Sequence, residues 1–195
     1  MTELSRNPVE CISVGLDMSL SATGFCLKRG CSISIETIKT TPRTCPNDLA
    51  RLRYIVDKVM ERIPSDVHMI CIEDVFTPQM RGQTGAAIEL AKLAGIIRLA
   101  LYEAGYPFYV VSPSQIKKYV TGKGTAQKSI IIREVYKRWG IDAKDDNQAD
   151  ACAMAHVAEC LVMRQFDDIP KFQVETIKKI IDERPKYNVE VSDGT

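Results

Sequence analysis

Apolar runs of strand length and apolar patterns of helical period alternate along the chain. Near its start, residues 11–16, 23–27 and 31–39 form three strand-length segments, and Arg29-Gly30 is a turn signal between the last two. Consecutive strands joined by short connections usually pair with each other. The pattern therefore predicts an antiparallel meander of three strands.

The next segments alternate between helix and strand. Residues 47–64 carry apolar side chains on one helical face, whereas residues 84–104 form a longer helix with apolar side chains on more than one face. The second helix can therefore meet the sheet with one face and a second subunit with another. A strand-length apolar run follows each helix, at residues 68–72 and 108–111.

The last part of the chain is helical in pattern. The expected helices span residues 113–120, 126–139, 145–165 and, in a short form, 174–182. The element order β-β-β-α-β-α-β followed by helices describes an α/β fold. We expect a mixed five-stranded sheet, with three antiparallel strands and then two parallel ones, flanked by helices.

Length and composition limit the number of domains. With 195 residues, 45% hydrophobic and 26% charged, the chain can build one α/β domain and little more. We expect it over residues 10–165, between a tail of residues 1–9 and a partly flexible extension of residues 166–195. No secretory signal or membrane span is apparent, and seven cysteines without a CxxC pair fit a reduced compartment, so a cytoplasmic location is expected.

Basic residues are concentrated in one segment. The net charge of +1 does not by itself indicate a protein that binds nucleic acid. Between residues 117 and 138, however, the single acid Glu134 stands among seven basic residues: Lys117, Lys118, Lys123, Lys128, Arg133, Lys137 and Arg138. A solvated surface explains such a run, and so does a surface for phosphates.

Acidic residues stand at the ends of expected core elements. Asp17 ends the first strand and Glu73 the fourth, where an ionised carboxylate is costly unless it is paired or binds a metal ion. Asp146 and Asp150 lie four residues apart on the late helix, so they share a face, and the alanines around them let that helix approach the sheet closely. Turn or capping roles remain open for each acid taken alone.

Three or four carboxylates at one site would repel one another at neutral pH, and divalent cations relieve that repulsion. The implied cofactor is Mg²⁺, or Mn²⁺ in its place, with two ions about 4 Å apart in each site. Such a pair activates a water molecule on one side of a phosphodiester and stabilises the leaving 3′ oxygen on the other. The expected reaction is phosphodiester hydrolysis that leaves 5′-phosphate and 3′-hydroxyl ends.

Four segments resemble a known family. In chain order they are GLDMSLSATGF, CIEDVF, SPSQIKKYVTGKGTAQKS and DNQADACAMA, all within residues 12–161. Together they resemble the RuvC-type Holliday junction resolvases. The resemblance implies a ribonuclease-H-like fold, a homodimer, and paired, symmetric cuts in four-way DNA junctions.

The same resemblance implies a set of metal ligands. Asp17 matches the first-strand ligand, shared by both ions, Glu73 the fourth-strand ligand and Asp150 the late-helix ligand. The family usually has an acid or a histidine three residues before the last aspartate, and this chain has Asn147 there. Asp146, one residue earlier, is the other candidate for the fourth ligand.

The resemblance also implies DNA contacts. Lys117 and Lys128 match lysines near the scissile phosphate, a role suited to a mobile point charge, and Lys128 is counted with the catalytic residues. Phe76 matches an aromatic residue that stacks on a base near the junction centre. Lys118 and Lys123, in the same basic segment, are further candidates for binding DNA.

Other functions remain open. A ribonuclease H for RNA/DNA hybrids, or a nuclease for other branched DNA, would share the fold and the metal site. Asn147 keeps a non-catalytic binder of branched DNA possible. An actin-like ATPase or sugar kinase is disfavoured, because it needs two core domains around its nucleotide, and the glycines of TGKGT lack a Walker pattern.

Overall fold

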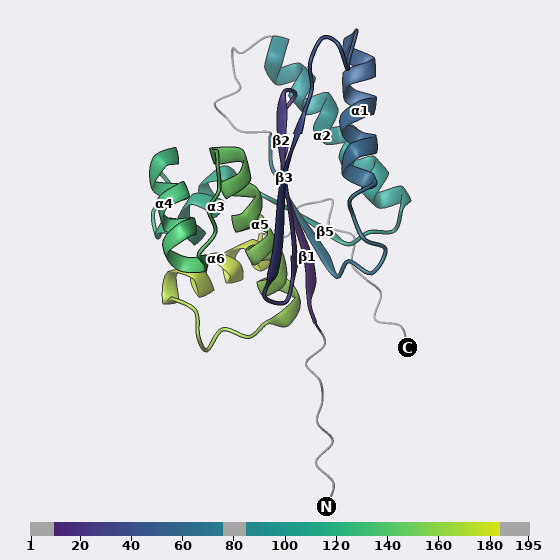
Figure 1. Ribbon diagram of the computed structural model, residues 1–195. Coiled ribbons are helices and arrows are strands. Elements are labelled where there is room, and N and C mark those ends of the chain that lie inside the picture. The colour runs from purple at the N-terminus through teal and green to yellow at the C-terminus, as the bar shows by residue number, and fades with distance from the viewer. Residues whose placement is uncertain (1–9, 76–84, 184–195) are drawn as a thin grey trace, which may run out of the picture.

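A mixed sheet separates two layers of helices in the computed structural model, which describes residues 10–75 and 85–183 (Figure 1). The strands are β1 (Ile12–Asp17), β2 (Ala22–Arg29), β3 (Ser32–Lys39), β4 (Met69–Glu73) and β5 (Phe108–Val111). The helices are α1 (Asp48–Met60), α2 (Gly85–Glu103), α3 (Pro113–Thr121), α4 (Lys128–Trp139), α5 (Asp146–Met163) and α6 (Lys171–Asp182).

The strand order in the sheet is β3-β2-β1-β4-β5. β2 pairs antiparallel with both β1 and β3, whereas β4 pairs parallel with both β1 and β5. The expected sheet of three antiparallel strands followed by two parallel ones is therefore confirmed. α2 makes the crossover from β4 to β5 that a parallel pair requires.

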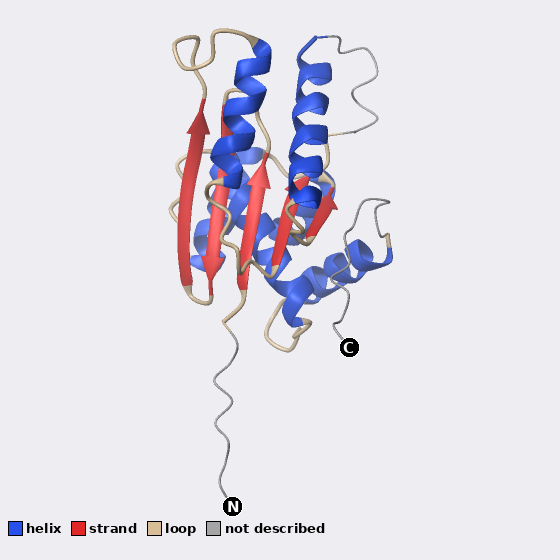
Figure 2. Cartoon of the chain, turned by 90° about the vertical axis from the view of Figure 1, so that its right-hand side faces the viewer, coloured by secondary structure: helices blue, strands red, loops and turns tan. Residues whose placement is uncertain are grey.

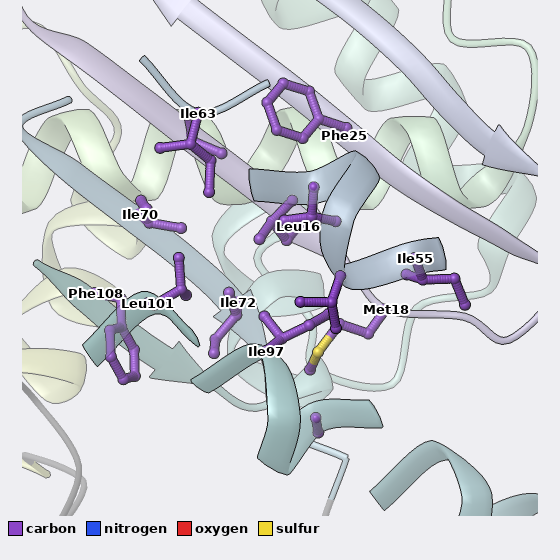
Figure 3. Close-up of a cluster of buried hydrophobic side chains, with 14 of the residues drawn as sticks. Leu16, Met18, Phe25, Ile55, Ile63, Ile70, Ile72, Ile97, Leu101 and Phe108 are labelled. Carbon is purple, nitrogen blue, oxygen red and sulfur yellow. The ribbon is translucent and has the colours of Figure 1, made fainter. Parts of the chain in front are cut away.

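Each face of the sheet is covered by its own group of helices. α1 and α2 lie on one face and α3 to α6 on the other (Figure 1), and Figure 2 shows the strands behind α1 and α2. The core under α1 and α2 is built from Leu16, Ile70 and Ile72 of the sheet, Ile55 of α1 and Ile97 of α2 (Figure 3). Among the described residues, none of the helices combines the length and the apolar character that a bilayer span needs.

The central strands are buried on both faces, so alternate residues serve different cores. In β1, Val14 and Leu16 belong to the core under α1 and α2, and Gly15 faces α5. In β4, Cys71 packs with the second core, the one under α3 to α6. Because strand side chains alternate with period two, Asp17 and Glu73 face the same side as Gly15 and Cys71.

Helix α5 lies very close to β1 and β2. A Cβ atom added at Gly15 would stand 1.9 Å from the carbonyl oxygen of Ala151, and one added at Gly24 would stand 2.2 Å from the carbonyl oxygen of Asn147. The alanines of α5 at positions 149, 151, 153 and 155 are fully buried. The close approach expected from these small residues is therefore confirmed.

Helix α6 begins earlier than the sequence pattern indicates, at Lys171 rather than at residue 174. Pro170 precedes its first turn, and the carbonyl oxygen of Pro170 accepts hydrogen bonds from the backbone of Gln173 and Val174. Gln173 is polar but buried. The apolar period alone therefore places the start of this helix too late.

The Gly15 contact predicts a large effect of one methyl group. Gly15→Ala would place Cβ inside the α5 backbone, and overpacking of this kind should lower the free energy of unfolding by about 3 kcal/mol or more. Gly85→Ala is the matched control, because a Cβ at Gly85 meets no atom of the described residues within 4 Å. Urea denaturation of both variants tests this, and equal stability of the two would contradict the close contact.

Candidate active site

Parallel pairing brings two acidic residues together at one end of the sheet. Leu16 of β1 stands opposite Ile72 of β4 in the strand register. The next residues, Asp17 and Glu73, therefore leave the sheet side by side at the carboxyl ends of their strands. The two carboxyl groups are close enough to shift each other's pKa, and Asp17 is only 7% exposed.

Helix α5 adds two more carboxylates from its first turns. Its N-cap is Asp145, whose side chain accepts a hydrogen bond from the backbone of Gln148 at 2.8 Å. Asp146 stands in the first turn, and Asp150 follows one turn later on the same face. The contacts at Gly15 and Gly24 bring this end of α5 against the sheet, so Asp150 lies near Asp17 and Glu73.

These side chains share one cleft of about 440 Å³. All four acids line it, together with two lysines, Lys117 from α3 and Lys128 from the start of α4. The remaining lining residues are Met18, Ser19, Leu20, Ser21, Ala86, Leu90, Pro113, Ile131 and Asn147. The cleft thus collects acids and bases from five separate elements.

Burial and mutual repulsion disfavour the charged forms of the inner acids. Burial, and then the charges of Glu73 and Asp150, hold the pKa of Asp17 well above its usual range. Burial also raises the pKa of Glu73. Burial, followed by the charges of Glu73 and Asp146, raises the pKa of Asp150 to about 7.

Asp146 differs from the inner three because it has a basic partner. The Lys128 ammonium donates to its carboxylate, which lowers the pKa of Asp146 and raises that of Lys128. The ammonium itself is well exposed. Lys117 also lines the cleft, where its charge opposes the rise in the pKa values of Glu73 and Asp150.

The cleft offers oxygen donors suited to a divalent cation. Within the described ranges, Asp150 Oδ1 is a buried oxygen with no hydrogen-bond partner. The neighbouring donors are carboxylate oxygens, the ligand type that hard divalent cations prefer. In residues 10–75 and 85–183, however, no three acidic, histidine or cysteine side chains already surround one point as metal ligands. Asp146 is turned to Lys128, and Asp17 to Glu73.

The other expected site residues are placed differently. Asn147 lines the cleft, but its amide nitrogen donates to the carbonyl oxygen of Ala22 at 2.8 Å and so ties α5 to β2. Lys118 is half-buried and Lys123 exposed, and neither lines the cleft. Phe76 lies outside the described residues.

Two structural residues of the site escaped sequence reasoning. Gly15 and Gly24 set how close α5 comes, and neither was singled out from the sequence. A usable signal was present, because an isolated glycine inside an apolar strand often marks a close backbone approach. Ser19 and Ser21, which also line the cleft, carried no signal beyond turn chemistry.

A mixed five-stranded sheet with an acidic cleft at the carboxyl ends of its central strands defines a ribonuclease-H-like protein. The family model described as crossover junction endodeoxyribonuclease RuvC matches residues 13–158. The chain belongs to this family, and the resemblance read from its motifs is confirmed.

Individual relatives agree with the family match. The RuvC crossover junction endodeoxyribonuclease of Corynebacterium glutamicum is 27% identical over 180 residues, which cover 86% of this chain and 79% of the relative. That of Brachyspira hyodysenteriae is 32% identical over 120 residues, which cover 61% of this chain and 72% of the relative.

Solved structures show the same fold. A structure of Thermus thermophilus RuvC superposes with a TM-score of 0.58 at 24% identity, covering 74% of this chain and 90% of that one. A second structure, of T. thermophilus RuvC in complex with Holliday junction substrate, gives a TM-score of 0.60 at 22% identity with the same coverage. The expected ribonuclease-H-like fold is thus confirmed.

The raised pKa of Asp150 predicts how stability depends on pH. An acid with a raised pKa in the folded state loses stability as the pH rises from about 3.9, its value in the unfolded chain, through about 7. Asp150→Asn should therefore raise the free energy of unfolding at pH 8 in chelator by about 2–4 kcal/mol. The gain should shrink as the pH falls through 4 and below, where Asp150 is protonated in the folded state and increasingly so in the unfolded chain.

Urea denaturation at pH 5 and pH 8 measures this dependence. The exposed Asp168→Asn is the control, because it removes a carboxylate outside the cleft. A gain of equal size at the two pH values would contradict the account of Asp150.

Proposed function

We propose that this protein is a junction-resolving endonuclease that cuts four-way DNA junctions by paired hydrolysis of phosphodiester bonds. The products are 5′-phosphate and 3′-hydroxyl ends, and the reaction depends on Mg²⁺ or Mn²⁺, two ions in each site. One observation supports this above all: Asp17, Glu73, Asp146 and Asp150 meet in a single cleft with Lys117 and Lys128, in a chain of the RuvC family. Membership in a nuclease family disfavours the non-catalytic alternative.

The four carboxylates are the groups that would hold the cations. The charges of both Glu73 and Asp150 raise the pKa of Asp17, so Asp17 is close to both of these acids. This position supports its role as the ligand shared by two ions. When bound, the cations would make a water molecule a better nucleophile and stabilise the leaving oxygen. Asp146 is assigned as the fourth ligand because it is a carboxylate that lines the cleft, and Asn147, whose amide nitrogen donates to Ala22, is the alternative.

Lys128 has two partners available to it. In the structure its ammonium pairs with Asp146, and its side chain is exposed enough to turn towards a phosphate instead. We assign it to the scissile phosphate together with Lys117, which lines the same cleft. Each lysine supplies positive charge where the attacked phosphate gains negative charge.

The wider DNA surface extends from the cleft along the basic segment. Lys118 and the exposed Lys123 are assigned to phosphates of the junction arms, where positive charges bind DNA without regard to sequence. Phe76 is assigned to stacking on a base near the junction centre. These contacts would belong to a nuclease domain of residues 10–165 that works on DNA in the cytoplasm.

Paired cuts need two active sites, and α2 offers a surface for a second copy. Its side chains Ile88, Ile96, Leu99 and Tyr102 are 40–64% exposed. Apolar side chains gathered on one solvent-facing helix often mark an interaction site. We therefore propose a homodimer that forms through α2.

Cleavage of a labelled four-way junction tests the proposed reaction. With Mg²⁺ or Mn²⁺, paired nicks should appear in the junction and not in a duplex of matched sequence, and chelator should abolish them. Asp17→Asn removes a metal ligand and should lower the rate by about 100-fold or more. Cleavage of a matched RNA/DNA hybrid in place of the junction would overturn the proposed substrate.

The dimer surface predicts a separate defect. Leu99→Glu places a charge in the exposed apolar face of α2, so the protein should sediment as a monomer and lose paired cutting. Leu49→Glu is the matched control, because Leu49 is 78% exposed on α1, away from that face. A dimer that survives Leu99→Glu would show that α2 is not the interface.

A further inference from the structure

Helix α6 lies after the segment that the family model matches. The family match ends at residue 158, before α6 begins at Lys171. Even so, α6 is not a loose tail, because Gln173, Thr176, Ile177 and Ile180 are all buried. It lies below α3 in Figure 1, and its apolar residues join the core that contains Ile116, Tyr119 and Val120 of α3.

One buried polar contact joins α6 to the carboxyl end of α3. The last carbonyl groups of a helix have no partner within the helix. The Gln173 side chain supplies a donor to one of these carbonyl groups, because its Nε2 atom donates to the carbonyl oxygen of Tyr119 at 2.9 Å. Arg138 of α4 supplies a donor to the next, donating from Nε to the carbonyl oxygen of Val120 at 2.8 Å.

A ring contact reinforces this hydrogen bond. The guanidinium group of Arg138 stands 5.1 Å from the centre of the Phe172 ring, within cation–π range. The same ring lies against Gly122, where a Cβ atom would meet it at 3.7 Å. Gly122 caps α3 in the left-handed conformation, with φ of 79°. Phe172 therefore covers the point at which the chain leaves α3.

Hydrogen bonds at the end of α3 connect Thr121 to the backbone of Lys117 and Lys123, the lysines assigned to DNA phosphates. The hydroxyl of Thr121 donates to the carbonyl oxygen of Lys117 at 2.8 Å and also reaches that of Lys123 at 3.0 Å. The backbone nitrogen of Lys123 donates back to the same hydroxyl at 3.1 Å. The end of α3 and the following turn thus form one bonded unit that carries both lysines.

The other end of α6 reaches the start of α3. Gln115 closes the capping box of α3 with its side-chain oxygen, and its Nε2 atom donates to Glu183 at 2.9 Å. Glu183 is the C-cap residue of α6. Contacts therefore hold α3 at both of its ends.

We propose that α6 is a positioning element that fixes α3 and its following turn, so that Lys117 and Lys123 meet the DNA backbone in a set geometry. Gln173 is its key positioning residue, since it is the buried side chain that bonds to the α3 backbone. The inference rests on the proposed junction binding for its DNA part. Its structural part concerns the free protein alone.

The first test measures amide hydrogen exchange in the full chain without DNA. Gln173→Met keeps the side-chain volume and removes the donor to Tyr119. It should speed exchange across residues 117–125 by about tenfold and leave β1 unchanged. Ile177→Val is the matched control, since it trims a buried residue of the same helix without touching that hydrogen bond. Equal exchange in the two variants, at equal loss of melting temperature, would overturn the inference.

The second test measures junction binding over a range of salt concentrations in Ca²⁺. Gln173→Met should weaken affinity about tenfold and reduce the slope of log Kd against log salt by about one phosphate contact. In a Lys117→Ala, Lys123→Ala background the same substitution should have no further effect, because the lysines through which it acts are gone. A full further loss in that background would show that α6 acts on stability alone.

The two tests also separate the two proposals. If the wild type neither binds nor cuts four-way junctions, but Gln173→Met still speeds amide exchange, the proposed function is overturned. The DNA part of this inference falls with it. A wild type that binds junctions while exchange stays unchanged would overturn the role of α6 and leave the proposed function standing.

Discussion

The close approach of α5 to β1 and β2 positions the acidic side chains of the cleft. Backbone atoms of α5 occupy the space that side chains at Gly15 and Gly24 would need. Without that approach, Asp150 could not stand beside Asp17 and Glu73, since a helix packed over ordinary side chains lies farther from the sheet. The lack of side chains at Gly15 and Gly24 thus allows α5 to bring Asp150 into the cleft.

The same approach creates an electrostatic conflict that only the site's chemistry resolves. Three carboxylates share a partly buried cleft, and both burial and mutual repulsion favour their protonated forms. A protein selected only for stability would not keep this arrangement, and local conflicts of this kind mark functional sites. Lys117 and Lys128 relieve part of the conflict, because both line the same cleft and carry positive charge.

The second helical layer organises these lysines. Lys117 comes from α3 and Lys128 from the first turn of α4, so the cleft's positive side depends on how those helices are held. Arg138 of α4 and Gln173 of α6 both bond to the last carbonyls of α3. The acids are thus set by the sheet and α5, whereas the bases are set by contacts among helices. Helix α5 links the two sets of contacts, because it packs against β1 and β2 and also against α3 and α4.

The helices and strands, the mixed sheet and the acidic residues of the cleft can all be predicted from the sequence alone. The spacing of apolar residues separates strands from helices. Asp17 and Glu73 stand out as candidate site residues because a charge at the end of a buried strand is costly. The strand register and the close approach of α5, by contrast, depend on tertiary contacts. The pairing of Leu16 with Ile72, the engagement of Asn147 with Ala22 and the packing of α6 on α3 each join residues far apart in the chain. Local patterns record which side chains are apolar, but not which distant backbone atoms they will meet, so these contacts emerge only when the whole chain is packed.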